Sequence, residues 1–240
     1  MRKFLLAVML FSGCPKGNDA PQPASLANEA RRTLAEREKR LTSFKLVVDT
    51  TEGENRAHHE VAFRSPNKSR GHMTSPQEFE LAFDGTTLVR LIHAQKKYEV
   101  VSLDMPAGDR AFFLASQFMP FVPEGYRAPL LPQSGVEAKS DKPNTVELTV
   151  KPGDGVTVSY VLRMPSGDFL EKRTTAEGQT RVLKMESEKC DDTLKLCVPT
   201  KLVERVGEQV LGTTEVTSVE LNAALPQDTF SPKVPEGWSK

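Results

Sequence analysis

The feature that most constrains the fold is an alternation of apolar and polar residues with a period of two. In Val146–Val150 (VELTV), for example, every second residue is apolar. Successive side chains of a β-strand point to opposite faces of the sheet, so this period is typical of strands with one buried face. Comparable segments recur from Phe44 to Asn222. The chain is therefore predicted to be mainly β, with antiparallel strands.

The expected strands are separated by short polar, Gly or Pro turns such as Asp84-Gly85. Strands joined in this way favour an antiparallel meander. A meander that curls until it closes or nearly closes protects its edges. We therefore expect a curled sheet or unclosed β-barrel. Its predicted strands cover residues 44–49, 60–64, 78–83, 87–92, 98–103, 146–150, 156–162, 169–175, 180–188, 194–205 and 209–222.

One long helix is expected before the first strand, over Leu26–Ser43. Its apolar residues lie near one narrow stripe, and Glu and Arg fill the other faces. The stripe consists of Leu26, Ala30, Leu34 and Leu41. A stripe this narrow predicts that the helix lies on a larger surface. The fold class is thus mainly β with helices (α+β).

The segment from residue 109 to 132 interrupts the alternation. It holds four of the twelve Phe residues, together with Met119. On a helix these side chains would point almost all round, and a helix that is apolar on every side is buried. Pro at positions 120, 123, 129 and 132 then predicts an irregular course. We expect a helical plug or lid in the mouth of the curled sheet.

The N-terminus has the layout of a secretory signal peptide. Arg2 and Lys3 precede an apolar run, Phe4–Phe11, and the small residues Ser12-Gly13 come before Cys14. Eight helical residues cover about 12 Å, which is too short for a membrane span. The cleavage end resembles a bacterial lipobox, in which the Cys receives a lipid. The alternative is an ordinary signal peptide cut elsewhere, with Cys14 incidental.

This layout divides the chain into three parts. Residues 1–13 are the expected signal peptide, residues 14–25 a lipidated, Pro-rich tether, and residues 26–240 a single β-rich domain. The chain has 32 basic and 32 acidic residues, and loss of the signal peptide leaves a small acidic excess. This charge excludes the basic surface typical of nucleic-acid binding and a polybasic membrane patch. Membrane contact is expected through the lipid anchor alone.

Two further cysteines, Cys190 and Cys197, remain as a pair, which suits an oxidising compartment. Their spacing fits a disulfide across the end of a β-hairpin, which in the chain-entropy model contributes about 2.5 kcal/mol. The alternative is half of a metal site with Asp191 and Asp192 between the thiols. We predict the disulfide.

No catalytic or metal motif is evident in the sequence. G-x-S-x-G, H-E-x-x-H and a Gly-rich phosphate loop are all missing. His58 and His59 are neighbours on an expected strand and face opposite ways, so they do not share a metal. We predict no catalytic residues, no metal and no cofactor. An envelope hydrolase with paired carboxylates is the remaining enzyme alternative.

The sequence feature that indicates a function is the large number of bulky apolar side chains. The inward strand faces and the interrupting segment together carry many large side chains, which either fill a core or line a cavity for an acyl chain or an apolar peptide. The predicted cavity residues are Phe63, Phe79, Leu81, Phe83, Phe112, Phe113, Phe118, Met119 and Phe121.

The end of the chain resembles a known family. A strand ends in Val219–Asn222, and a Leu-Pro and a Phe follow within Ala224–Phe230, before Pro235–Trp238 closes the pattern. Thr42-Ser43-Phe44 and Phe83-Asp84-Gly85 add to the likeness. The pattern resembles the outer-membrane lipoprotein-sorting group of LolA, LolB and RseB, here as a lipid-anchored member.

The resemblance implies an unclosed β-barrel over a helical lid, with a hydrophobic cavity that holds acyl chains. In that family an Arg gates the cavity, but Arg64, Arg70 and Arg90 all fit, so none is assigned. The family also implies a periplasm-facing location. Pro15 follows Cys14 instead of the Asp that marks inner-membrane retention, so the outer membrane is favoured. The alternative function is a structural or sensor module with a filled core that binds another envelope protein.

Overall fold

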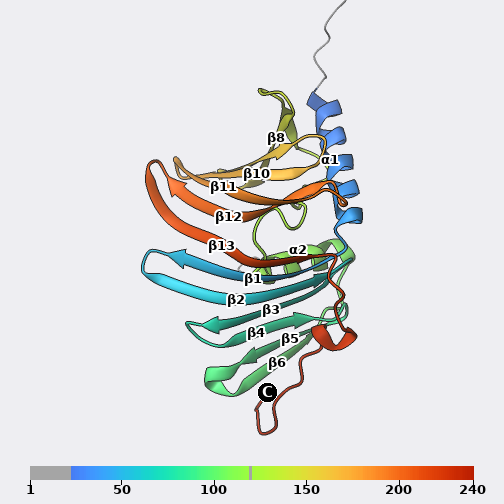
Figure 1. Ribbon diagram of the computed structural model, residues 1–240, viewed down its shortest axis with the longest axis vertical. Coiled ribbons are helices and arrows are strands. Elements are labelled where there is room, and N and C mark those ends of the chain that lie inside the picture. The colour runs from blue at the N-terminus through green and yellow to red at the C-terminus, as the bar shows by residue number, and fades with distance from the viewer. Residues whose placement is uncertain (1–22, 119–120) are drawn as a thin grey trace, which may run out of the picture.

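The fold is built on one antiparallel sheet of thirteen strands in the computed structural model, which describes residues 23–118 and 121–240. The strand order is β6-β5-β4-β3-β2-β1-β13-β12-β11-β10-β9-β8-β7 (Figure 1). Each half of the sheet is a meander in chain order, as the alternation predicts. The strands are β1 (Ser43–Glu52), β2 (Asn55–Arg64), β3 (Lys68–Ser75), β4 (Phe79–Phe83), β5 (Thr87–Ile92), β6 (Lys97–Ser102), β7 (Glu137–Lys139), β8 (Thr145–Gly153), β9 (Val156–Arg163), β10 (Asp168–Ala176), β11 (Gln179–Asp191), β12 (Leu196–Val206) and β13 (Gln209–Leu221).

The two meanders are joined by the first and last strands. The register pairs Phe44 of β1 with Leu221 of β13. The other ends of the sheet, β6 and β7, do not pair with each other in the described chain, so the curled sheet stays unclosed. The predicted fold class, an antiparallel and unclosed half-barrel with few helices, is confirmed.

Burial follows the predicted alternation closely. In β1 Phe44, Leu46 and Val48 are each 0% exposed, and in β8 Val146 and Leu148 are buried in the same way. The register places these residues on one face of the sheet, which we call the inner face. The other face is called the outer face.

The N-terminal helix α1 (Pro23–Arg40) begins three residues earlier and ends three residues earlier than predicted. The side chain of Asn222 fixes this end, because its Nδ2 donates to the Arg40 carbonyl at 2.8 Å and its Oδ1 accepts from the Thr42 amide at 2.8 Å. The chain is thereby turned into β1. In the described part of the chain, no helix has the length and apolar character to span a membrane.

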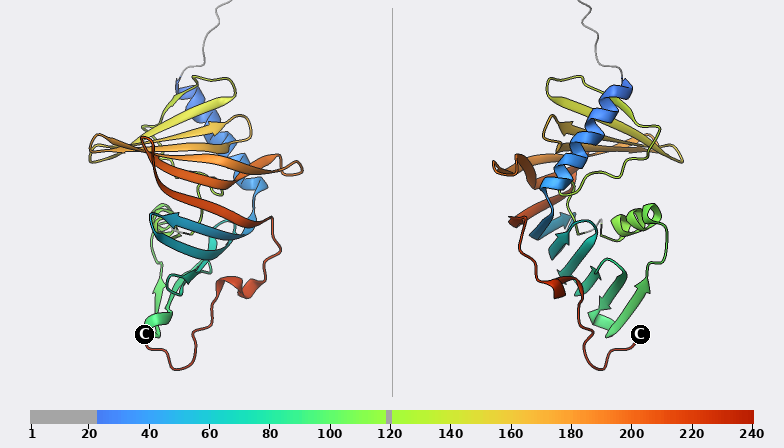
Figure 2. Two further views of the ribbon diagram at one scale, coloured as in Figure 1. Left: turned by 60° about the vertical axis from the view of Figure 1, so that its left-hand side comes forward. Right: turned by 90° about the vertical axis from the view of Figure 1, so that its right-hand side faces the viewer.

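The two helices cover opposite ends of the inner face. Helix α1 packs on one end through a small core that joins Ala30 and Leu34 to Leu148 and Leu162. Helix α2 (Ala107–Phe118) packs on the other end, in the position predicted for a helical plug. Figure 2 shows α2 on one side of strands β1–β6 and the C-terminal segment on the other. The C-terminal segment contains a short 3₁₀ helix, η2 (Gln227–Phe230). Another 3₁₀ helix, η1 (His93–Gln95), lies between β5 and β6.

Candidate binding cavity

Between the two helices, the inner face holds a cavity of about 330 Å³. Its floor comes from β1, β2 and β10–β13, and its roof is the segment Phe121–Glu124, which follows α2. The apolar part of its lining consists of Val48, Phe121, Val122, Pro123, Leu183 and Leu202. The cavity therefore combines strands from both meanders with the chain that connects them.

Hydrogen bonds with β2 and β12 hold the roof and the residues directly after it in place. His59 Nε2 lies 3.2 Å from the Phe121 carbonyl, and the Tyr126 hydroxyl donates to the Pro199 carbonyl at 2.8 Å. Both His59 and Tyr126 are 1% exposed. Burial raises the pKa of Tyr126 well above its ordinary value, so the phenol keeps the proton that it donates.

A buried ion pair fastens α1 to the next part of the roof. Arg37 Nη2 donates to the Gly125 carbonyl at 2.7 Å and to the Cys197 carbonyl at 3.2 Å, and Arg37 Nε lies 3.6 Å from Asp168 Oδ1. Asp168 Oδ1 also accepts from the Cys197 amide at 3.0 Å. Arg37 and Asp168 are each 2% exposed. Arg37 lies on the apolar stripe of α1, whereas the sequence pattern assigned Arg to the other faces, so that expectation was wrong for this residue.

Charged side chains also line the cavity. Lys172 pairs with Glu124 of the roof, and Arg181 and Glu204 are part of the lining; Leu183 lies cross-strand from both Lys172 and Glu204. Burial alone would lower the pKa of Lys172, but the Glu124 carboxylate outweighs it and raises the pKa above its ordinary value. Lys172 is therefore a fixed positive charge at neutral pH. The cavity lining therefore mixes apolar and charged side chains.

The predicted cavity residues are distributed differently from this lining. Phe121 lines the cavity. The other described members belong to the core between α2 and the sheet; they are Phe63, Phe79, Leu81, Phe83, Phe113 and Phe118. Phe79 and Phe113 are only partly buried there. The side chain of Phe112, and Met119 and Cys14, lie outside the described residues.

The predicted disulfide is confirmed. Cys190 and Cys197 face each other across the β11–β12 hairpin, with their Cα atoms 4.0 Å apart and their sulfur atoms bonded. The alternative, a thiolate metal site, is excluded because neither sulfur is free. The three Arg residues considered for gating lie elsewhere: Arg70 pairs with Glu80, Arg90 with Glu99, and Arg64 donates to the Leu225 carbonyl.

His59 makes the stability of the roof sensitive to pH. Burial lowers its pKa below the ordinary value of 6.5, because a charged imidazole is poorly solvated there. The unfolded chain then binds a proton at a higher pH than the folded chain, so stability falls as the pH decreases below about 6.5. Each unit of pKa shift corresponds to about 1.4 kcal/mol.

We therefore expect His59→Gln to lose less stability between pH 7.5 and pH 5 than the unchanged protein, as measured by urea unfolding at both values. His58→Gln is the matched control, because His58 is half-exposed and pairs with Asp49 at 2.6 Å. Equal losses in the His59 variant and the unchanged protein would contradict a buried, neutral His59.

Comparisons with known proteins support the fold. No protein-family model matches the sequence, and no curated protein matches it. Among solved structures, a LolA superfamily protein from Nitrosomonas europaea is 13% identical, with a TM-score of 0.51 over 85% of this chain and 97% of its own.

Two further structures are similar at low identity. A domain assigned to outer membrane lipoprotein sorting, from Vibrio parahaemolyticus, is 9% identical with a TM-score of 0.58, over 88% of this chain and 97% of its own. A DUF1329 family protein from Desulfovibrio piger is 10% identical with a TM-score of 0.56, over 87% of this chain and 96% of its own. The fold that the sequence resemblance implies is thus confirmed, and the chain has a LolA-like fold.

Proposed function

We propose that this protein is a lipid-anchored binding protein of the cell envelope, which holds an acyl chain of a lipid or lipoprotein in the inner-face cavity. In this proposal residues 1–13 are a signal peptide, Cys14 carries the lipid and residues 14–25 form the tether to a binding domain over residues 26–240. The observation that carries the proposal is the cavity itself, with the apolar residues in its lining and its roof from the segment after α2.

The size and chemistry of the cavity support an amphipathic ligand. Its volume of about 330 Å³ lies within the range of roughly 300–1,000 Å³ that is typical of ligand pockets. Val48, Leu183 and Leu202 would contact the acyl chain, and apolar burial would contribute about 25 cal/mol per Å². Lys172 and Arg181 would face an anionic head group. No covalent step is needed, so the proposed role is binding without catalysis.

The names of two similar structures also support a binding role, because one is a LolA superfamily protein and the other is assigned to outer membrane lipoprotein sorting. The proposed location faces the periplasm, with the outer membrane favoured by Pro15. A second candidate is an envelope module that binds another protein. It is favoured by the filled core beneath α2, in which Phe83 is 0% and Phe118 is 5% exposed.

The test is to fill the cavity with a larger side chain. The protein is purified from a bacterial periplasm, examined by native mass spectrometry for a bound lipid, and titrated with a fluorescent fatty acid. Leu183→Trp places an indole in the cavity and is expected to weaken saturable binding on the order of tenfold, which is about 1.4 kcal/mol.

Val182→Trp is the matched control, because Val182 is the neighbouring residue of β11 and points to the outer face. Binding that is unchanged by Leu183→Trp, or absent from the folded unchanged protein, would contradict the acyl-chain proposal. In that case the alternative of a protein-binding module would be tested by pull-down.

A further inference from the structure

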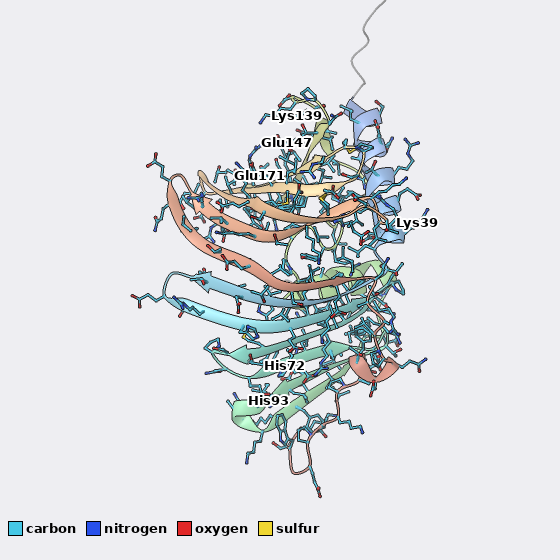
Figure 3. The ribbon with its side chains drawn as sticks, in the orientation of Figure 1. Lys39, His72, His93, Lys139, Glu147 and Glu171 are labelled. Atoms are coloured by element: carbon cyan, nitrogen blue, oxygen red, sulfur yellow. A yellow bond between two sulfur atoms is a disulfide. The ribbon has the colours of Figure 1, made fainter. Side chains whose placement is uncertain are left out.

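The outer face, on the opposite side of the sheet from the cavity, carries a cluster of possible metal ligands. His72, Glu78 and His93 each offer one ligand atom, and these three atoms lie within 4.8 Å of one another. Figure 3 labels His72 and His93, which lie close together near the C-terminal segment. We call these three residues the His-Glu-His triad.

The register of three neighbouring strands brings the triad together. His72 is in β3, Glu78 directly precedes β4, and His93 directly follows β5. Met73 pairs with Phe79, and Phe79 pairs with Ile92. Both Met73 and Phe79 pack against the inner core, so the neighbouring triad residues point to the outer face. The register thus fixes the strand ends beside which the triad lies, while Glu78 and His93 themselves belong to the β3–β4 and β5–β6 connections.

The carboxylate of Glu78 lies between the two imidazoles. His72 Nε2 is 3.2 Å from Glu78 Oε1, and His93 Nδ1 is 3.1 Å from Glu78 Oε2. Two ligand atoms bound to one tetrahedral zinc ion at about 2.1 Å lie roughly 3.4 Å apart. Small side-chain rotations would thus bring all three atoms to coordination distance from one ion.

The surroundings shield one side of the triad. The imidazole of His93 meets the indole of Trp238 edge-on, with 4.9 Å between ring centroids and an interplanar angle of 87°. His93 Nε2 is buried and has no hydrogen-bond partner among the described residues. Backbone hydrogen bonds from Tyr98 to Ser239 and from Ser239 to Lys96 hold the segment with Trp238 in place. His72 and His93 are partly buried, and Glu78 is exposed. The three ligand atoms leave one open position on a tetrahedral ion.

We propose that the His-Glu-His triad binds one divalent cation of the zinc type, through His72 Nε2, the Glu78 carboxylate and His93 Nδ1. Two imidazoles and one carboxylate are a ligand set that zinc and other transition metals prefer over Mg²⁺ and Ca²⁺, which take oxygen ligands. The bound ion would link β3, the start of β4 and the β5–β6 connection beneath Trp238. The site is independent of the acyl-chain proposal, because it uses no residue of the cavity.

The test measures zinc binding directly. The protein, purified without a polyhistidine tag and stripped with a chelator, is dialysed against buffered ZnCl₂, and its zinc content is measured by mass spectrometry. One zinc ion per chain is expected, with a rise in the melting temperature. Co²⁺ in place of Zn²⁺ is expected to give the visible absorption of a tetrahedral site. Excess MgCl₂ is expected not to displace the ion.

Two ligand variants and one control decide the outcome. His93→Ala and Glu78→Gln are each expected to weaken zinc binding by at least about 100-fold, while circular dichroism verifies that each variant is folded. His58→Ala is the control, because His58 is another partly exposed imidazole beside a carboxylate and lies outside the triad. Absence of stoichiometric zinc, or equal affinity in Glu78→Gln and the unchanged protein, would overturn the proposal.

Discussion

Replacement of Arg37 by Met is expected to lower the free energy of unfolding by about 3–5 kcal/mol, which is typical when one partner of a buried ion pair is removed. The physical reason is the Asp168 carboxylate, which is 2% exposed and would lose its buried partner, keeping the more exposed Arg163, whose Nη1 lies 3.6 Å from Asp168 Oδ2. The Gly125 and Cys197 carbonyls would also lose their donor. Urea unfolding at pH 7.5 measures the loss.

The matched control is Arg32→Met, on an exposed position of the same helix. It is expected to change stability by less than about 0.5 kcal/mol. The double variant Arg37→Met/Asp168→Asn removes both charges and is expected to recover part of the loss, because no unpaired charge stays buried. A loss in Arg37→Met no larger than in Arg32→Met would refute the role of the pair.

The second large effect is expected at Gly71 of β3, beneath the cavity roof. A Cβ at this position would lie 2.4 Å from Cγ of the Phe121 ring, so the ring would have to move. Overpacking of this kind costs about 1–3 kcal/mol. We therefore expect Gly71→Ala to be destabilised by this amount in urea unfolding, and its displaced roof to weaken the fatty-acid binding described above.

The cause can be isolated by removing the ring. In the Phe121→Ala background the space beside Gly71 is open, so Gly71→Ala should then cost little, and the two effects should be far from additive. Additive losses in the double variant would show that Phe121 is not the obstacle. This cycle tests the position of the roof independently of any ligand.

The fold was largely predictable because the sheet has one buried face. The apolar residues at every second position of Val146–Val150 became core positions, and the hairpin around the polar residues 95–97 formed β5 and β6. Helix α1 was predicted from its stripe, but its end was misplaced by three residues. That end depends on Asn222, which is distant in sequence and contacts Thr42 only after the sheet has formed.

The cavity could not be located from the sequence, since its lining is not a cluster of aromatic residues. Leu183 and Leu202 are ordinary strand residues, and only the curl of the sheet leaves space above them. The large Phe side chains instead fill the core beneath α2. Arg37 was detectable in principle, because it continues the spacing of Ala30, Leu34 and Leu41. The triad was not recognised in the sequence because its members come from β3, the residue before β4 and the residue after β5, which only the sheet brings together.

The pairing of β1 with β13 has a consequence for the order of events during synthesis and folding. Phe44 leaves the ribosome early, but its partner Leu221 is almost the last strand residue to be made. Contacts so distant in sequence form slowly, because a long loop must close first. The two meanders therefore cannot be joined before the chain is nearly complete. Each meander, in contrast, pairs strands that are neighbours in sequence, so the two halves can form before they are joined.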